Sequence, residues 1–166
     1  MILGATGHRL HKLPGYRGER TDKRIREALL SVALEALDEW QPDEVISGMA
    51  TGWDLAVAMA AMVSNIPFRA YVPFEGQCRL WGRADQEAYR GLLDEAKEVR
   101  VISPIERNSA YVERDELMVD HSDHMAALYC GDPRSGTGVT LRYADGWLVP
   151  WTNYAESYMT EITKTA

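Results

Sequence analysis

The sequence predicts an α/β fold with a doubly wound parallel sheet and helices on both faces of that sheet. Two observations carry this prediction. Short apolar runs alternate with longer stretches in which apolar residues recur every three or four positions, and glycine-rich turns join several of the runs to the stretch that follows. Strict strand–helix alternation is typical of parallel sheets, because each parallel connection needs a crossover that packs back on the sheet.

Six strands and five helices can be assigned from these patterns. The expected strands span residues 1–6, 43–47, 67–73, 98–103, 124–129 and 147–151. The expected helices span residues 21–40, 52–64, 84–97, 111–122 and 137–145. Thr21 is the expected N-cap of the first helix, and the second should be largely buried because it is rich in alanine and methionine. Residues 152–166 are polar and indicate a tail or a docking helix, so we expect a single domain over residues 1–166.

Composition narrows the class of partner. The 166 residues are 46% hydrophobic and 26% charged, with a formal net charge of −7. This acidic balance disfavours a nucleic-acid partner, which calls for a positive surface. No apolar run approaches the roughly 20 residues that span a bilayer, so no membrane partner is expected. The two cysteines, Cys78 and Cys130, fit no metal spacing and indicate a reducing, cytoplasmic location. A homo-oligomer is left open.

The turns that follow the expected strands hold the candidate ligand-binding residues. In a parallel sheet these turns meet at one edge, where ligands bind at the point at which the strand order reverses. Glycine allows close approach to the backbone, and helix N-termini bind phosphate. Each turn taken alone is equally consistent with an ordinary tight turn. The candidates are Thr6, Gly7, His8, Arg9, Gly48, Met49, Gly52, Trp53, Asp54, Phe74, Glu75, Gly136, Thr137, Gly138 and Thr140.

Two carboxylates stand out among these candidates. Asp54 lies in the first turn of the second helix, where it either contacts a ligand or caps the helix. Glu75 follows the third strand and is either an acid or base facing the crevice or a solvated loop residue. Carboxylates repel phosphate and accept hydrogen bonds from hydroxyls and amines, so we expect both to contact a sugar or base.

The sequence indicates no metal site and no cofactor. His121 and His124 are three residues apart and flanked by Asp120 and Asp123, which resembles a ligand set. The helix should end near Ser122, however, so the two imidazoles need not converge. An interaction of a histidine with the end of the helix dipole explains the pattern better.

Five segments together resemble the YpsA-like branch of the SLOG superfamily, in the right order along the chain. They are Gly7–Arg9, Ile46–Asp54, Pro73–Gln77, Arg114–Asp115 with Met118–Asp123, and Ser135–Gly138 with Tyr143–Ala144. The superfamily also contains Smf/DprA-type and Lonely Guy-type domains. The resemblance implies a Rossmann-like fold that binds nucleotides or nucleotide-derived ligands, and it adds Arg114 and Asp115 to the candidate ligand-binding residues.

The resemblance leaves two functions open. Lonely Guy relatives are phosphoribohydrolases whose glycine-rich loop ends in a catalytic glutamate, whereas Arg142 occupies that position here. We therefore expect a sensor or sequestering module for a nucleotide-derived ligand. The alternative is an enzyme that cleaves an N-glycosidic bond, a nucleotide N-glycosidase in which Glu75 or Asp54 supplies the catalytic carboxylate.

Overall fold

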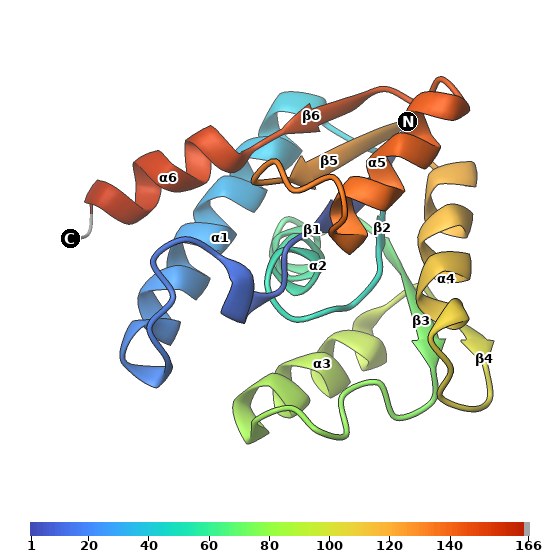
Figure 1. The fold of residues 1–166 in the computed structure, drawn as a ribbon, viewed down its shortest axis with the longest axis horizontal. Coiled ribbons are helices and arrows are strands. Elements are labelled where there is room, and N and C mark those ends of the chain that lie inside the picture. Colours follow the sequence, from blue (N-terminus) through green and yellow to red (C-terminus); the bar gives the residue numbers. More distant parts are fainter. Residues whose placement is uncertain (165–166) are drawn as a thin grey trace.

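A six-stranded sheet, parallel throughout, forms the centre of the molecule (Figure 1). The computed structural model describes residues 1–164, apart from the side chain of Thr21. The strands are β1 (Ile2–Gly7), β2 (Glu44–Ser47), β3 (Phe68–Phe74), β4 (Glu98–Ser103), β5 (His124–Leu128) and β6 (Trp151–Asn153). Their order is β4-β3-β2-β1-β5-β6, so the direction of winding reverses between β1 and β5. The predicted doubly wound parallel fold is confirmed.

Helices cover both faces of the sheet, as the alternation predicted. They are η1 (Leu10–Lys12), α1 (Glu19–Trp40), α2 (Trp53–Val63), α3 (Arg83–Glu95), α4 (Ser109–Asp120), α5 (Gly136–Gly146) and α6 (Ala155–Lys164). The helices α1 and α6 pack together, as do α2 and its neighbours α1 and α3, whereas α4 packs with α5 (Figure 1). The first group lies on one face of the sheet and the α4–α5 pair lies on the other.

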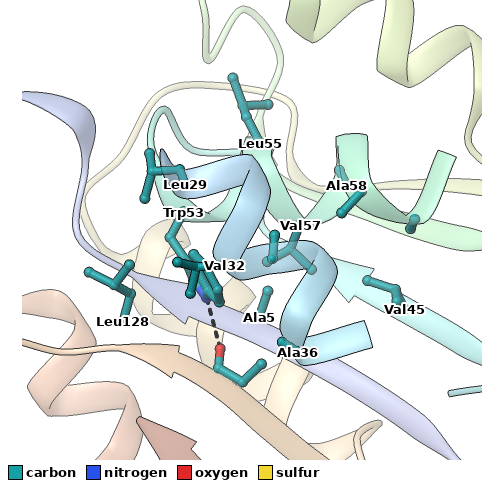
Figure 2. Close-up of a cluster of buried hydrophobic side chains, with 14 of the residues drawn as sticks. Ala5, Leu29, Val32, Ala36, Val45, Trp53, Leu55, Val57, Ala58 and Leu128 are labelled. Carbon is teal, nitrogen blue, oxygen red and sulfur yellow. Dashed lines mark hydrogen bonds between the residues drawn. The ribbon is translucent and has the colours of Figure 1, made fainter. Parts of the chain in front are cut away.

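The main hydrophobic core lies between the sheet and the first group of helices (Figure 2). The side chains of Leu29, Val32 and Ala36 recur at the three- and four-residue spacing of one helical face and point into this core. Most of α2 is buried, as its composition predicted. This burial fixes the start of α2 against β1, and the candidate site lies beside that start.

Two details of the sequence-based assignment are wrong. The first helix begins two residues before Thr21, and its N-cap is Gly18. The sixth strand begins at Trp151 rather than at residue 147, because α5 runs to Gly146 and a turn follows in which Leu148 has a φ of 60°. Residues beyond this strand form α6, which docks on α1 with Tyr158 and Ile162 buried. Up to residue 164, this segment is thus a helix packed on α1.

The length and polarity of the helices and the environment of the two cysteines bear on the expected membrane and redox properties. Within residues 1–164, none of the helices combines the length and apolar character that a bilayer crossing requires. Cys78 is buried and Cys130 is exposed, and both thiols are free.

Candidate functional site

A cavity of about 140 Å³ lies where the sheet order reverses, at the carboxyl ends of β1 and β5. Ligands bind at this position in open parallel sheets because the loops on either side diverge there. The cavity is bounded by the turn after β1, the turn before α2, the first turns of α4 and the N-terminus of α5. Its lining residues are Thr6, Gly7, His8, Arg9, Lys12, Ala50, Asp54, Tyr111, Arg114, Asp115, Ser135, Gly136 and Thr137.

The N-terminus of α5 opens into the cavity. Ser135 is the N-cap, and its Oγ accepts a hydrogen bond from the amide of Gly138 at 3.1 Å. The amides of Gly136 and Thr137 are the first of the helix and have no partner inside it, so they are available to an acceptor in the cavity. Gly138 packs so tightly that a Cβ there would lie 2.6 Å from the carbonyl oxygen of Asp132. The result is a helix N-terminus with free amides, the kind of group that suits an anion, held by a tight turn.

A buried arginine forms the floor of the site. Arg114 is 5% exposed, and its Nη1 donates to the carbonyl oxygen of Gly48. A Cβ on Gly48 would lie 2.5 Å from that Nη1, so this position needs glycine to admit the guanidinium. Nε of Arg114 lies 2.5 Å from Oδ1 of Asp115, and Oδ2 of Asp115 accepts from Oγ1 of Thr140 at 3.1 Å. This chain of contacts ties the turn after β2 to the first turns of α4 and α5.

Asp54 is a buried carboxyl group that the fold leaves only partly satisfied. It is 5% exposed, its Oδ2 accepts only a long bond from the amide of Ala50 at 3.4 Å, and its Oδ1 has no partner. Burial raises the pKa of Asp54 to about 7, although the nearby Arg114 guanidinium acts in the opposite direction. The hydrogen bond goes to the loop before α2 and not to the helix amides, so the geometry does not favour the capping alternative.

The turn after β1 supplies a histidine, two cations and an aromatic contact. Nε2 of His8 lies 3.0 Å from the amide of Cys130, which therefore donates to it, and burial lowers the pKa of His8. Both observations favour the neutral imidazole. Arg9 lies over the ring of Tyr111 with its Cζ 5.3 Å from the centroid, and Lys12 completes this wall of the cavity.

Several candidate residues support the cavity without lining it. Met49 and Trp53 are buried in the main core, and the indole nitrogen of Trp53 donates to the carbonyl of Ala126 at 3.0 Å (Figure 2). Trp53 turns inward because Gly7 leaves space: a Cβ on Gly7 would lie 2.6 Å from the Trp53 side chain. Phe74 is buried and meets Tyr111 edge to face.

The remaining candidates lie beside the cavity or apart from it. Gly52, with a φ of 93°, packs against the backbone of the turn after β1, where a Cβ would lie 2.5 Å from the carbonyl oxygen of His8. Glu75 is exposed and lines a different groove, between α3 and β4. The structure therefore brings Asp54 and the α5 N-terminus together but leaves Glu75 elsewhere.

The two C-terminal histidines diverge. Nδ1 of His121 lies 2.6 Å from the hydroxyl of Tyr71, whereas His124 stacks on Trp40 and contacts the Thr152 hydroxyl at 2.9 Å. Among residues 1–164, no group of three or more His, Cys, Asp or Glu side chains is arranged to hold a metal ion.

Sequence reasoning missed Lys12, Ala50, Tyr111 and Ser135. Ala50 and Ser135 lie inside segments that were singled out and Lys12 lies three residues beyond one, so proximity was the available signal. Tyr111 carries no such signal, because only the packing of α4 against the turn after β1 brings it to the cavity.

Comparison with known proteins decides the family. The profile of the YspA SLOG family, YpsA, matches residues 3–145. The chain belongs to this family. The chain is 25% identical over 138 residues to the uncharacterized SPbeta prophage-derived protein YoqJ of Bacillus subtilis, and the match covers 73% of this chain and 80% of YoqJ.

Solved structures show the same fold at low identity. DNA processing protein A from Helicobacter pylori, whose single-stranded DNA binding mode has been described, matches with a TM-score of 0.61 and 15% identity over 92% of this chain and 64% of that one. DprA from Streptococcus pneumoniae matches with a TM-score of 0.59 and 15% identity, and the match covers 99% of this chain and 56% of DprA. The protein TM1055 matches with a TM-score of 0.56 and 12% identity, and the match covers 90% of this chain and 71% of TM1055. The chain thus spans less than two thirds of either DNA processing protein.

Proposed function

We propose that this protein binds a nucleotide or nucleotide-derived small molecule in the cavity at the β1–β5 switch point, as a sensor or sequestering module. The observation that carries the proposal is the combination of groups in this one cavity. Helix amides and two cations, Arg9 and Lys12, suit phosphate, and the partly unsatisfied carboxyl of Asp54 suits a hydroxyl or amine. We further propose that the protein is cytoplasmic.

The proposed roles of the cavity residues follow from the charge of each residue and from the partners it already has. Arg114 is already engaged by the carbonyl of Gly48 and by Asp115, so it serves as the scaffold of the site. The phosphate then belongs with the amides of Gly136 and Thr137, and with Arg9. The sugar or base belongs with Asp54, because a carboxylate repels phosphate and accepts from ribose hydroxyls.

The test is a ligand panel read by thermal shift and calorimetric titration. Nucleoside mono- and diphosphates and ADP-ribose-type sugar nucleotides should stabilise the wild-type protein, whereas unphosphorylated nucleosides should do so less. Asp54→Asn should weaken binding roughly five- to a hundred-fold, the equivalent of one buried hydrogen bond lost. Glu75→Gln is the matched control and should leave binding unchanged, because Glu75 lies in another groove. Equal losses in both variants would contradict the assignment.

An enzymatic N-glycosidase is the second candidate, favoured by one observation. Because burial raises the pKa of Asp54 to about 7, this carboxyl can hold or release a proton near neutral pH. Such a group can donate a proton to a departing base or accept one from an attacking water. Chromatography of the same incubations decides: free base released by the wild type and not by Asp54→Asn supports hydrolysis, and binding without base supports the sensor.

Single-stranded DNA belongs in the same panel. The expectation of no nucleic-acid partner rested on net charge alone, and a protein of the same fold from Helicobacter pylori binds single-stranded DNA. Labelled oligothymidylate in an anisotropy titration at low and physiological salt tests this directly. Binding that a mononucleotide displaces would place DNA in the same cavity, and binding that it does not displace would indicate another surface.

A further inference from the structure

The outer edge of β4 is the most exposed part of the sheet. β4 ends the strand order and has β3 as its neighbour on one side (Figure 1). Val99 and Val101 are 44% and 42% exposed, and both line a groove of about 340 Å³ that α3 forms with this strand. An edge strand with apolar side chains is a template for pairing with another strand.

The hydrogen-bond pattern identifies which residues of β4 can pair outward. The amide of Lys97 donates to the carbonyl of Phe68 at 2.9 Å, and Val99 lies opposite Ala70 in the parallel register. Backbone groups alternate in direction along a strand, so Ala70, two residues after Phe68, also faces β4, and the residue in register with it, Val99, faces away from β3. The backbone groups of Val99 and Val101 therefore face away from the sheet, whereas those of Glu98, Arg100 and Ile102 face β3.

This pattern restricts how two β4 strands can pair antiparallel, because an outward-facing residue must lie opposite another one. A two-fold axis at Arg100 would place two arginines opposite each other. An axis at Val101 would place Glu98 opposite Pro104 and Arg100 opposite Ile102, so neither charge would lie opposite a charge of the other sign. An axis at Val99 places Glu98 of each copy opposite Arg100 of the other. Charge complementarity therefore selects the register centred on Val99.

We propose that two copies of this chain associate through their β4 edges in this register, forming one continuous sheet. Val99 then meets Val99 of the second copy on the face that carries α3, and the stem of Lys97 covers Val101. On the other face, Glu98 and Arg100 already form an ion pair at 2.9 Å within one strand, and both can engage the second copy. The β1–β5 cavity lies three strands away and stays open, so this association is independent of the proposed ligand.

Cysteine cross-linking tests the register. In a background where the exposed Cys130 is replaced by serine, Val99→Cys should oxidise to a covalent dimer, because residues on the axis have Cβ atoms about 5 Å apart. Val101→Cys is the matched control: it has similar exposure and the same face, yet the two copies of residue 101 would be about 14 Å apart. Equal cross-linking of both variants would overturn the register.

Charge reversal tests the interface in solution. Light scattering of the wild type should give the mass of two chains. The single variants Glu98→Arg and Arg100→Glu should each have the mass of one chain, and the double variant should form the dimer again. Circular dichroism confirms that each variant is folded. A monomeric wild type at about 0.1 mM, a concentration at which an interface of only modest affinity would form, would overturn the proposal. A dimer unaffected by either reversal would overturn it as well.

Discussion

Replacing Asp54 by asparagine should markedly change how the free energy of unfolding depends on pH. The pKa of Asp54 is raised from 3.8 to about 7 in the folded protein, chiefly by burial. Between these values the folded chain keeps a proton that the unfolded chain has released, so the free energy of unfolding falls as the pH rises. Wild type should therefore lose about 4 kcal/mol between pH 4 and pH 8 from this group alone.

The assay is urea denaturation of wild type and Asp54→Asn at pH 4.5, 6 and 8. Asparagine does not titrate, so the difference between the variant and the wild type should grow by about 3 kcal/mol in favour of the variant over this range. The amide leaves one unpaired donor at the Oδ1 position, which costs about 1–3 kcal/mol at every pH and does not affect the slope. A difference that stays constant from pH 4.5 to pH 8 would refute the assignment of a buried, proton-retaining carboxyl.

Three further predictions follow from local geometry. Ser135→Ala should lower the free energy of unfolding by about 1 kcal/mol, measured by denaturation, and weaken phosphate binding, because the N-cap of α5 is lost; unchanged stability would contradict the cap. Gly52→Ala should cost at least about 2 kcal/mol, since its φ is 93° and its Cβ would meet the His8 carbonyl, whereas Gly82→Ala, in open space, should be nearly neutral in the same melts. Because burial lowers the pKa of His8, protonation opposes folding, and stability should fall as the pH drops below about 6.5. His8→Gln should remove that part of the pH profile, and a profile unchanged from wild type would count against it.

Hydrophobic periodicity was enough to predict the architecture. The spacing of Leu29, Val32 and Ala36 marks one helical face, and the short apolar runs became the strands of the sheet. The error at the sixth strand has a physical origin, since Trp147 and Leu148 are apolar yet 66% and 88% exposed in a turn. A run of apolar residues predicts burial only when a partner surface exists, and the sequence does not reveal that surface.

The candidate site was predicted less completely. The glycine turns lie at the edge of the sheet that holds the cavity, because every strand of a parallel sheet ends on the same side. The sequence pattern does not give the direction of a side chain. Trp53 follows a glycine turn and points into the core, whereas Tyr111 lies on a helix distant in sequence and lines the cavity. The burial that raises the pKa of Asp54 likewise arises from packing among segments far apart in sequence.

The most direct test of the central claim is a crystal structure of the protein with the tightest-binding nucleotide from the panel. The account predicts a phosphate on the amides of Gly136 and Thr137 beside Arg9, with a sugar hydroxyl or base amine donating to the carboxyl group of Asp54. A nucleotide bound with its phosphate away from the α5 N-terminus, or in the groove that holds Glu75, would contradict it.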